Sequence, residues 1–396
     1  MKNVLPILRT HWRLLASIIL GVVVVGGLLT YRLGSLTGGL AAGELSVAGA
    51  PLGWQGLYHQ PLYLPLKIVQ SIIFFFIADH NQLITRLPNM LFGLLSVITF
   101  AGLIRSFHGN RTTLLTVTLF ATSSWFLHVS RLASYDVLYL WAVPLLLLGY
   151  SLRQRYEQSA LVFYGSALSV SLLLFVPGLV WLIVPMIILS RHDILDGWAA
   201  HRAWWQRLMY GLLGLLWLPL LLPALVRSGA EFRLWLGLPA VFPALTTFGK
   251  QLGAVPIHLL IRGPAYPELW LGRLPILDVV TLAFVIAGGY FYARHWRAQR
   301  TRQLLLILII GTILIGLGGP VGISLLIPVV FLSAAAGMNS LLKSWLRVFP
   351  HNPIARGLGI GLLSVAVAVS CTYNLRAYFV AWPHNVTTET VFHYRR

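Results

Sequence analysis

Long apolar stretches alternate with short polar ones along almost the whole chain. A helix that crosses a bilayer needs roughly 20 mostly apolar residues, and about eleven stretches approach this length. They are 14–31, 87–104, 112–129, 136–152, 159–174, 176–190, 208–226, 277–293, 303–318, 321–338 and 357–375. The pattern predicts an all-α polytopic membrane protein, in which the pair of stretches around Pro177 forms either two spans or one broken hairpin.

Two segments between the predicted spans are long, 32–86 and 227–276. The first contains the apolar run Pro61 to Ala78, but Lys67 lies inside this run, and a span here would invert every later loop. We therefore interpret the run as a helix lying at the outer membrane interface. Because the sequence has no internal repeat, we expect a single transmembrane domain over residues 1–396, with 376–396 as an outer tail.

Composition supports the membrane class: 58% of the residues are hydrophobic, 10% are charged, and the mean hydropathy is +0.80. Lys and Arg number 29 against 10 Asp and Glu, a net charge of +19. With a cytoplasmic N-terminus, roughly 17 of these basic residues fall on the inner segments, as the positive-inside rule requires. The charge therefore reflects topology, and no nucleic-acid partner is expected. We expect a cytoplasmic or ER-type membrane.

Two of the scarce carboxylates lie at the outer membrane boundary, where an ionised group is costly and commonly marks a function. Glu44 follows the first span, and Asp136 opens the fourth. Glu44 could instead be a solvated loop acid. Asp136 could be a helix N-cap or the ion-pair partner of Arg131. Residue types alone leave these alternatives open.

A family resemblance rests on four motifs in a fixed order. They are Glu44, His59-Gln60-Pro61-Leu62-Tyr63, Arg86-Leu87-Pro88 and Arg131-Leu132-Ala133-Ser134-Tyr135-Asp136. Their order and spacing resemble the GT-C membrane glycosyltransferases, specifically the protein O-mannosyltransferase and aminoarabinose-transferase group (glycosyltransferase family 39). Recognisable motifs cover about the first 190 residues. The resemblance implies a GT-C-like fold and an enzyme that moves a hexose or pentose from a polyprenyl-phosphate donor to an acceptor on the outer face.

The resemblance also implies the catalytic carboxylates, Glu44 as the base and Asp136 as the second acid. In the family an Asp-Glu pair in the first outer loop carries the base, and Gly43 stands here at the Asp position. Three alternatives follow: Glu44 takes over as base, the acceptor needs less help, or the protein binds the lipid-linked sugar without transferring it.

The leaving group would be a phosphate, so cations at the membrane edge would stabilise it. Aromatic rings could also stack on the sugar. The predicted substrate-binding residues are His59, Tyr63, Lys67, Arg86, Arg131, Tyr135, Arg262 and Arg273. The alternatives are long cationic side chains that reach lipid headgroups and an ordinary aromatic belt at the interface.

No cofactor is expected, and the sequence contains no typical metal motif on the outer side. A divalent ion shared by Glu44 and Asp136 is not indicated, because separate single carboxylates are a poor cage for a hard cation. The expected partners are the polyprenyl-phosphate sugar, an unknown acceptor and membrane lipids. A membrane transporter or lipid-handling protein is the rival function, although transporters usually show repeats and polar groups near the midplane.

Overall fold

The computed structural model describes residues 19–49, 53–77, 81–156, 159–200 and 203–392. Within these ranges the chain folds into helices joined by turns and loops, with no β-strand. The helices are Ile19–Thr30, α2 (Ala42–Ala48), α3 (Trp54–His59), α4 (Leu64–Phe76), α5 (Gln82–Phe107), α6 (Asn110–Thr122), α7 (Ser124–Arg131), α8 (Val137–Arg155), α9 (Ala160–Leu173), α10 (Val180–Leu189), α11 (Arg191–Ala200), α12 (Trp204–Gly214), α13 (Leu218–Arg227), α14 (Gly229–Trp235), α15 (Leu245–Leu260), α16 (Val279–Arg294), α17 (Gln299–Gly316), η1 (Ile323–Leu325), α18 (Ile327–Val348), α19 (Pro353–Arg376), η2 (Ala377–Ala381) and α20 (Val386–Glu389).

The all-α membrane fold is confirmed, but the count of eleven spans is not. In the described residues six helical segments are long and apolar enough to cross a bilayer, and the bent pair α6 and α7 would make a seventh. The predicted spans 14–31, 159–174, 176–190 and 277–293 correspond to apolar helices of fewer than 18 residues, and residues 14–18 lie outside the described ranges. Hydropathy marked these segments correctly as apolar helices, whereas their length depends on where turns interrupt them.

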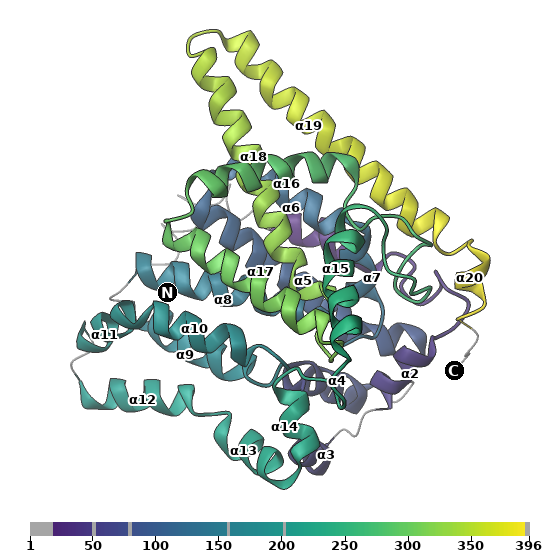
Figure 1. The fold of residues 1–396 in the computed structure, drawn as a ribbon, viewed down its shortest axis with the longest axis vertical. Helices are drawn as coiled ribbons and strands as arrows, with labels where there is room; N and C mark the ends of the chain where they lie inside the picture. The colour runs from purple at the N-terminus through teal and green to yellow at the C-terminus, as the bar shows by residue number, and fades with distance from the viewer. Residues whose placement is uncertain (1–18, 50–52, 78–80, 157–158, 201–202, 393–396) are drawn as a thin grey trace.

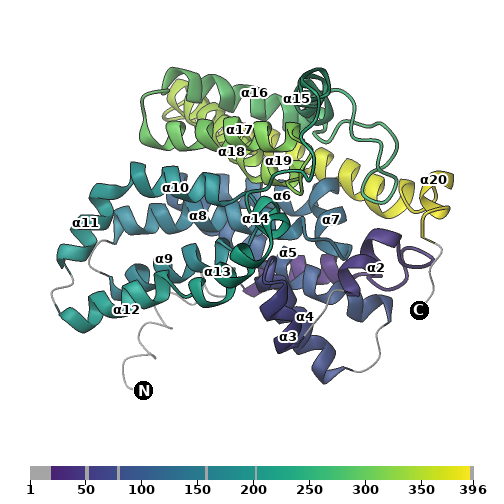
Figure 2. The same cartoon turned by 60° about the horizontal axis from the view of Figure 1, so that its bottom comes forward.

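Helices α5 to α8 occupy the middle of the molecule (Figures 1 and 2). Helices α15 to α19 lie on one side of them, and α9, α12 and α13 lie on the other. Helices α18 and α19 form a hairpin that projects from the body, and the chain then returns so that α20 lies near α2 (Figure 1). The segment between the first helix and α5 and the end of the described chain therefore meet at one edge of the bundle.

The bend between α6 and α7 places the end of α7 at this edge. The two helices meet at 60° at Ser123, whose side chain caps α7 by accepting from the N–H of Phe126. Asn374 of α19 secures the start of α7, since its Oδ1 accepts from the backbone N–H and the hydroxyl of Ser124 at 3.1 and 3.0 Å. These hydrogen bonds satisfy backbone groups that a broken helix leaves unpaired.

Within the apolar run that begins at Pro61, residues Leu64–Phe76 form α4, a helix of 13 residues that is too short to span a bilayer by itself. Its last turn exposes Phe75 and Phe76, at 84% and 77%, whereas its first turn is buried. Such an end suits contact with lipid, and the interfacial position of α4 stays a prediction.

Helices α16 and α18 pack in direct backbone contact at Gly288. A Cβ atom built at Gly288 would lie 1.8 Å from the carbonyl oxygen of Ser333, a backbone atom that cannot move aside cheaply. We expect Gly288→Ala to lower the free energy of unfolding by about 1–3 kcal/mol through overpacking. The neighbouring Gly289 has open space for a Cβ, so Gly289→Ala is the matched control. Thermal unfolding in detergent measures both; equal melting temperatures would contradict the close packing.

Candidate active site

Glu44 lies on the first turn of α2 and is buried, with 3% of its surface exposed. Its carboxylate accepts four hydrogen bonds. Nε and Nη2 of Arg86 donate one to each oxygen, both at 2.7 Å, and the backbone N–H groups of Ala41 and Ala133 donate at 3.1 Å each. An ionised carboxylate offers about four acceptor positions. Glu44 is therefore not a solvated loop acid, and its acceptor positions are already occupied by protein donors.

Arg86, on the second turn of α5, is equally buried and binds several groups of the segment that precedes α3. Besides Glu44, its guanidinium donates to the carbonyl oxygens of Leu33 and Gly39, both at 3.1 Å, and to the hydroxyl of Thr37 at 2.9 Å. A buried bidentate ion pair, here with all three guanidinium nitrogens donating to protein, is strong and geometrically specific. Arg86 thus holds α2 against α5, and its nitrogens already serve protein acceptors.

Arg131 ends α7 and carries a buried guanidinium with spare donors. Its Nη2 donates to the carbonyl oxygen of Tyr31, and the group lies over the rings of Tyr378 and Phe379, 5.1 and 4.7 Å from their centroids. Nε and Nη1 have no hydrogen-bond partner within the described part of the chain. The ion pair with Asp136 considered from the sequence is absent there. The positive charges of Arg131 and Arg86 act on each other, and the buried carboxylate of Glu44 pairs with Arg86.

Asp136 belongs to a second cluster, with Tyr63 and Tyr135, whose rings stack at 4.0 Å. Asp136 is the N-cap residue of α8, but its side chain makes no capping hydrogen bond. Its Oδ2 instead accepts from the hydroxyl of Ser324 at 2.9 Å. Burial and the nearby charge of Asp136 raise the pKa of the Tyr63 phenol. Three of the predicted site residues are thus brought together.

His59 is the last residue of α3, and Lys67 lies on the first turn of α4. Lys67 is buried on α4 and donates from Nζ to the carbonyl oxygen of Gln60 at 2.8 Å. Burial lowers the pKa of Lys67, and the charge of Glu231 opposes this shift. His59 is exposed, and its Nδ1 lies 2.9 Å from Nη1 of Arg227. Sequence reasoning did not single out Arg227, which comes from the far end of α13.

Arg262 and Arg273 are exposed and flank a closed loop between α15 and α16. The loop closes where the N–H of Gly263 donates to the carbonyl oxygen of Leu274 at 2.9 Å. The indole N–H of Trp270 reaches the same oxygen at 2.6 Å. Gly263 is required there, because a Cβ would lie 2.1 Å from that oxygen. Neither arginine contacts Glu44 or Asp136 by hydrogen bond within the described residues.

The same loop carries Glu268, which is not among the site residues predicted from the sequence. Its Oε2 lies 2.8 Å from the position that a Cβ of Gly43 would take. Burial and the charge of Glu44 raise the pKa of Glu268. No local sequence signal marks this contact, because α2 and the loop are far apart in the chain.

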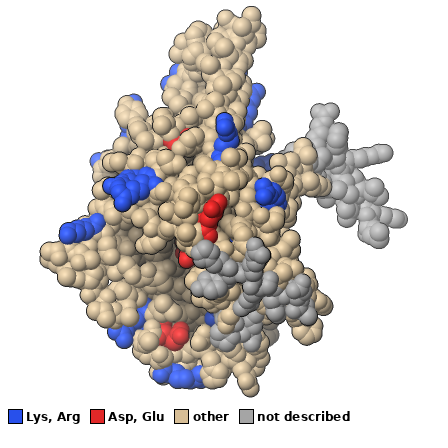
Figure 3. All heavy atoms as spheres, turned by 90° about the vertical axis from the view of Figure 1, so that its right-hand side faces the viewer, with Lys and Arg blue, Asp and Glu red and all other residues tan. Residues whose placement is uncertain are grey.

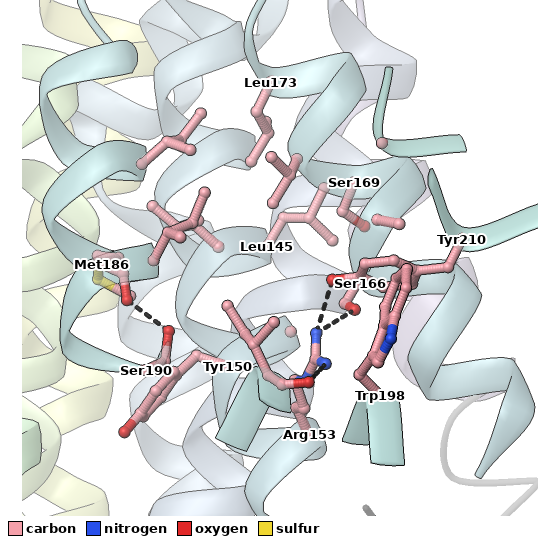
Figure 4. A pocket seen from close by; sticks show the side chains of 18 of the residues that line it. Leu145, Tyr150, Arg153, Ser166, Ser169, Leu173, Met186, Ser190, Trp198 and Tyr210 are labelled. Carbon is pink, nitrogen blue, oxygen red and sulfur yellow. Dashed lines mark hydrogen bonds between the residues drawn. The ribbon is translucent and has the colours of Figure 1, made fainter. Parts of the chain in front are cut away.

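Two cavities lie away from these clusters. One of about 360 Å³ is enclosed mainly by apolar side chains of α8 to α10 (Figure 4). At its rim Arg153 donates to the hydroxyl groups of Tyr210 and Ser166 at 2.9 and 3.3 Å. The other, of about 700 Å³, lies between the loop segment Leu271–Leu274 and the end of α19. None of the predicted site residues lines either cavity.

Charged side chains are sparse on the surface near the Glu44 centre. On the face that carries α2 and α20, a few acidic side chains lie near the middle and basic ones are scattered around them (Figure 3). In the described part of the chain, no group of three His, Cys, Asp or Glu side chains could hold a metal ion. The charge near the Glu44 centre therefore comes from separate charged side chains.

No protein-family model and no curated protein matches the sequence. Solved structures do. ArnT from Cupriavidus metallidurans, at 12% identity, aligns over 95% of this chain and 78% of its own, with a TM-score of 0.58 in the apo state and 0.60 bound to undecaprenyl phosphate.

The oligosaccharyltransferase of Archaeoglobus fulgidus, in a structure tethered with an acceptor peptide, aligns over 96% of this chain at 14% identity, with a TM-score of 0.50. The chain spans little more than half of that protein, 56%. Both neighbours are GT-C superfamily membrane glycosyltransferases. With its long apolar helices, this chain is therefore an integral membrane protein that has the fold of the GT-C membrane glycosyltransferases.

Proposed function

We propose that this protein is a glycosyltransferase that moves a sugar from a polyprenyl-phosphate donor to an acceptor on the outer face of the membrane. The observation that carries the proposal is the fold shared over 95% of the chain with ArnT, which binds undecaprenyl phosphate in one of its structures. The buried guanidinium of Arg131 supports it, because two of its nitrogens have no hydrogen-bond partner among the described residues and a charged donor binds an anionic phosphate strongly.

In this proposal Arg131 meets the donor phosphate with the N–H groups that lack a protein partner. The apolar cavity beside Leu271–Leu274 suits the isoprenoid chain. The phosphate leaves as a stable anion, so the reaction needs a cation on the leaving group and a carboxylate that takes the proton of the acceptor hydroxyl. Glu44 is the base predicted from the sequence.

A second function, a relative that binds the lipid-linked sugar without transferring it, is favoured by one observation. All four donors to the Glu44 carboxylate belong to the protein, so Glu44 by itself has no acceptor position left for a substrate hydroxyl. The orientation also stays a proposal: an inner N-terminus and a reaction centre on the outer face.

The proposed function can be tested in cells that lack the protein. This test does not require the sugar to be identified first. We expect their lipid extracts, analysed by mass spectrometry, to accumulate one polyprenyl-phosphate sugar that the wild-type protein consumes when restored. The purified protein should also bind undecaprenyl phosphate. A lipid profile unchanged by deletion would contradict transfer. Uptake of solute into proteoliposomes, absent from empty vesicles, would instead favour the transporter.

A further inference from the structure

The carboxylate of Glu268, from the loop between α15 and α16, lies beside Gly43 of α2. Gly43 directly precedes Glu44 on the first turn of α2, and a Cβ at Gly43 would stand 2.8 Å from Oε2 of Glu268. This distance is shorter than a non-bonded contact allows, so only glycine leaves room for Glu268 in its present position. The backbone of Gly43 has no positive φ, so conformational freedom does not explain the glycine.

Glu268 differs from Glu44 in what its carboxylate contacts. Glu44 is buried and accepts from four protein donors, whereas Glu268 is partly exposed and accepts no hydrogen bond from the described residues. Its position is nevertheless held: the indole N–H of Trp382 donates to the carbonyl oxygen of the preceding Pro267 at 3.2 Å. Of the two neighbouring carboxylates, only Glu268 has acceptor positions open to a ligand.

We infer that Glu268 is the proton acceptor of the transfer reaction and that Glu44 is a positioning residue; this inference rests on the proposed function. The acceptor hydroxyl oxygen forms the new bond to the anomeric carbon, and its proton passes to the Glu268 carboxylate. The bond between that carbon and the phosphate oxygen breaks, and the polyprenyl phosphate leaves with the electron pair. Glu44 holds Arg86, α2 and the loop at Ala133 in place around this centre.

The electrostatics agree with this division of roles. Partial burial and the negative charge of Glu44 raise the pKa of Glu268 above its ordinary value of 4.5. A carboxylate whose charge is destabilised in this way takes a proton more readily than one in water. Since the base acts in its ionised form, transfer is lost as the pH falls through this raised pKa, and the acid limb of the rate profile lies above pH 4.5.

The test combines one substitution with a relocation of the carboxylate. We expect Glu268→Gln to slow consumption of the accumulated polyprenyl-phosphate sugar by about 10²–10⁴-fold, the usual contribution of a general base. Undecaprenyl phosphate should bind with unchanged affinity. The double variant Gly43→Asp/Glu268→Ala brings a carboxylate from α2 into the vacated space and should regain at least ~10-fold over Glu268→Ala. Glu389→Gln, at an exposed acid of α20, is the control.

Wild-type turnover by Glu268→Gln would overturn the inference. It would also be overturned if the acid limb of the rate profile lay at the same pH in Glu268→Asp and wild type but disappeared in Glu44→Gln. Failure of Gly43→Asp/Glu268→Ala to exceed Glu268→Ala, with both proteins binding undecaprenyl phosphate, would also count against it. These results leave the proposed function standing. The proposed function fails separately, if no polyprenyl-phosphate sugar accumulates in cells that lack the protein.

Discussion

Replacement of Arg86 by leucine is expected to lower the free energy of unfolding by about 3–5 kcal/mol, because it leaves the Glu44 carboxylate buried without its counter-charge. The ion pair is inaccessible on both sides, at 1% and 3% exposure, so water cannot replace the lost partner. The carbonyl oxygen of Leu33 also loses its Arg86 donor, whereas that of Gly39 keeps the hydroxyl of Thr37. We expect a lower melting temperature in detergent and poor recovery of folded protein.

The double variant Glu44→Leu/Arg86→Leu separates charge from packing. With both partners gone no uncompensated charge is buried, so we expect it to recover part of the stability that Arg86→Leu loses. Recovery is incomplete, because the N–H groups of Ala41 and Ala133 lose their acceptor. The control is Arg273→Leu at an exposed arginine. An Arg86→Leu protein as stable as this control would rule out a structural role for the ion pair.

Replacement of Arg131 by glutamine is expected to weaken binding of undecaprenyl phosphate by about tenfold to a hundredfold. A hydrogen bond between a charged donor and an anion contributes about 1.5–3 kcal/mol, and each 1.4 kcal/mol changes a dissociation constant tenfold. The two guanidinium nitrogens without a partner, Nε and Nη1, make this arginine, rather than Arg86, the one that can donate to a phosphate.

Direct titration of the purified variant with undecaprenyl phosphate measures this effect. Arg297→Gln is the matched control, since Arg297 is exposed between α16 and α17 and is not among the predicted binding residues. Thermal unfolding of the two variants shows whether the loss of the contact with Tyr31 disturbs the fold. An affinity equal to wild type in Arg131→Gln would place the phosphate elsewhere and direct attention to Lys67 or Arg262.

The hydrophobic pattern predicted most of the helices, because a membrane helix is a local property of about 20 consecutive residues. It predicted α5 and α8 closely. It did not predict that the third apolar stretch breaks into α6 and α7 at 60°, although the polar run Thr122-Ser123-Ser124 lies there and serine is a common N-cap residue. This bend matters for the site, because it directs the end of α7, with Arg131, toward α2 and α5.

The sequence predicted which residues belong to the candidate site better than it predicted what those residues contact. Glu44 and Arg86 were both singled out, and the structure joins them as the ion pair of the described residues. Arg86 was expected to serve the donor phosphate, and the structure instead engages all three of its guanidinium nitrogens with protein acceptors. Arg262 and Arg273 were placed with the same set, and they lie exposed on a separate loop.

The sequence by itself determined that the chain is a helical membrane protein with few acids, and it identified Glu44 and Asp136 as the carboxylates to examine. Only the tertiary structure decided that Glu44 is saturated by protein donors and that Glu268 fills the space beside Gly43. The reason is physical. Apolar periodicity acts over neighbouring residues, whereas the approach of α2 to a loop after α15 depends on how all the intervening helices pack.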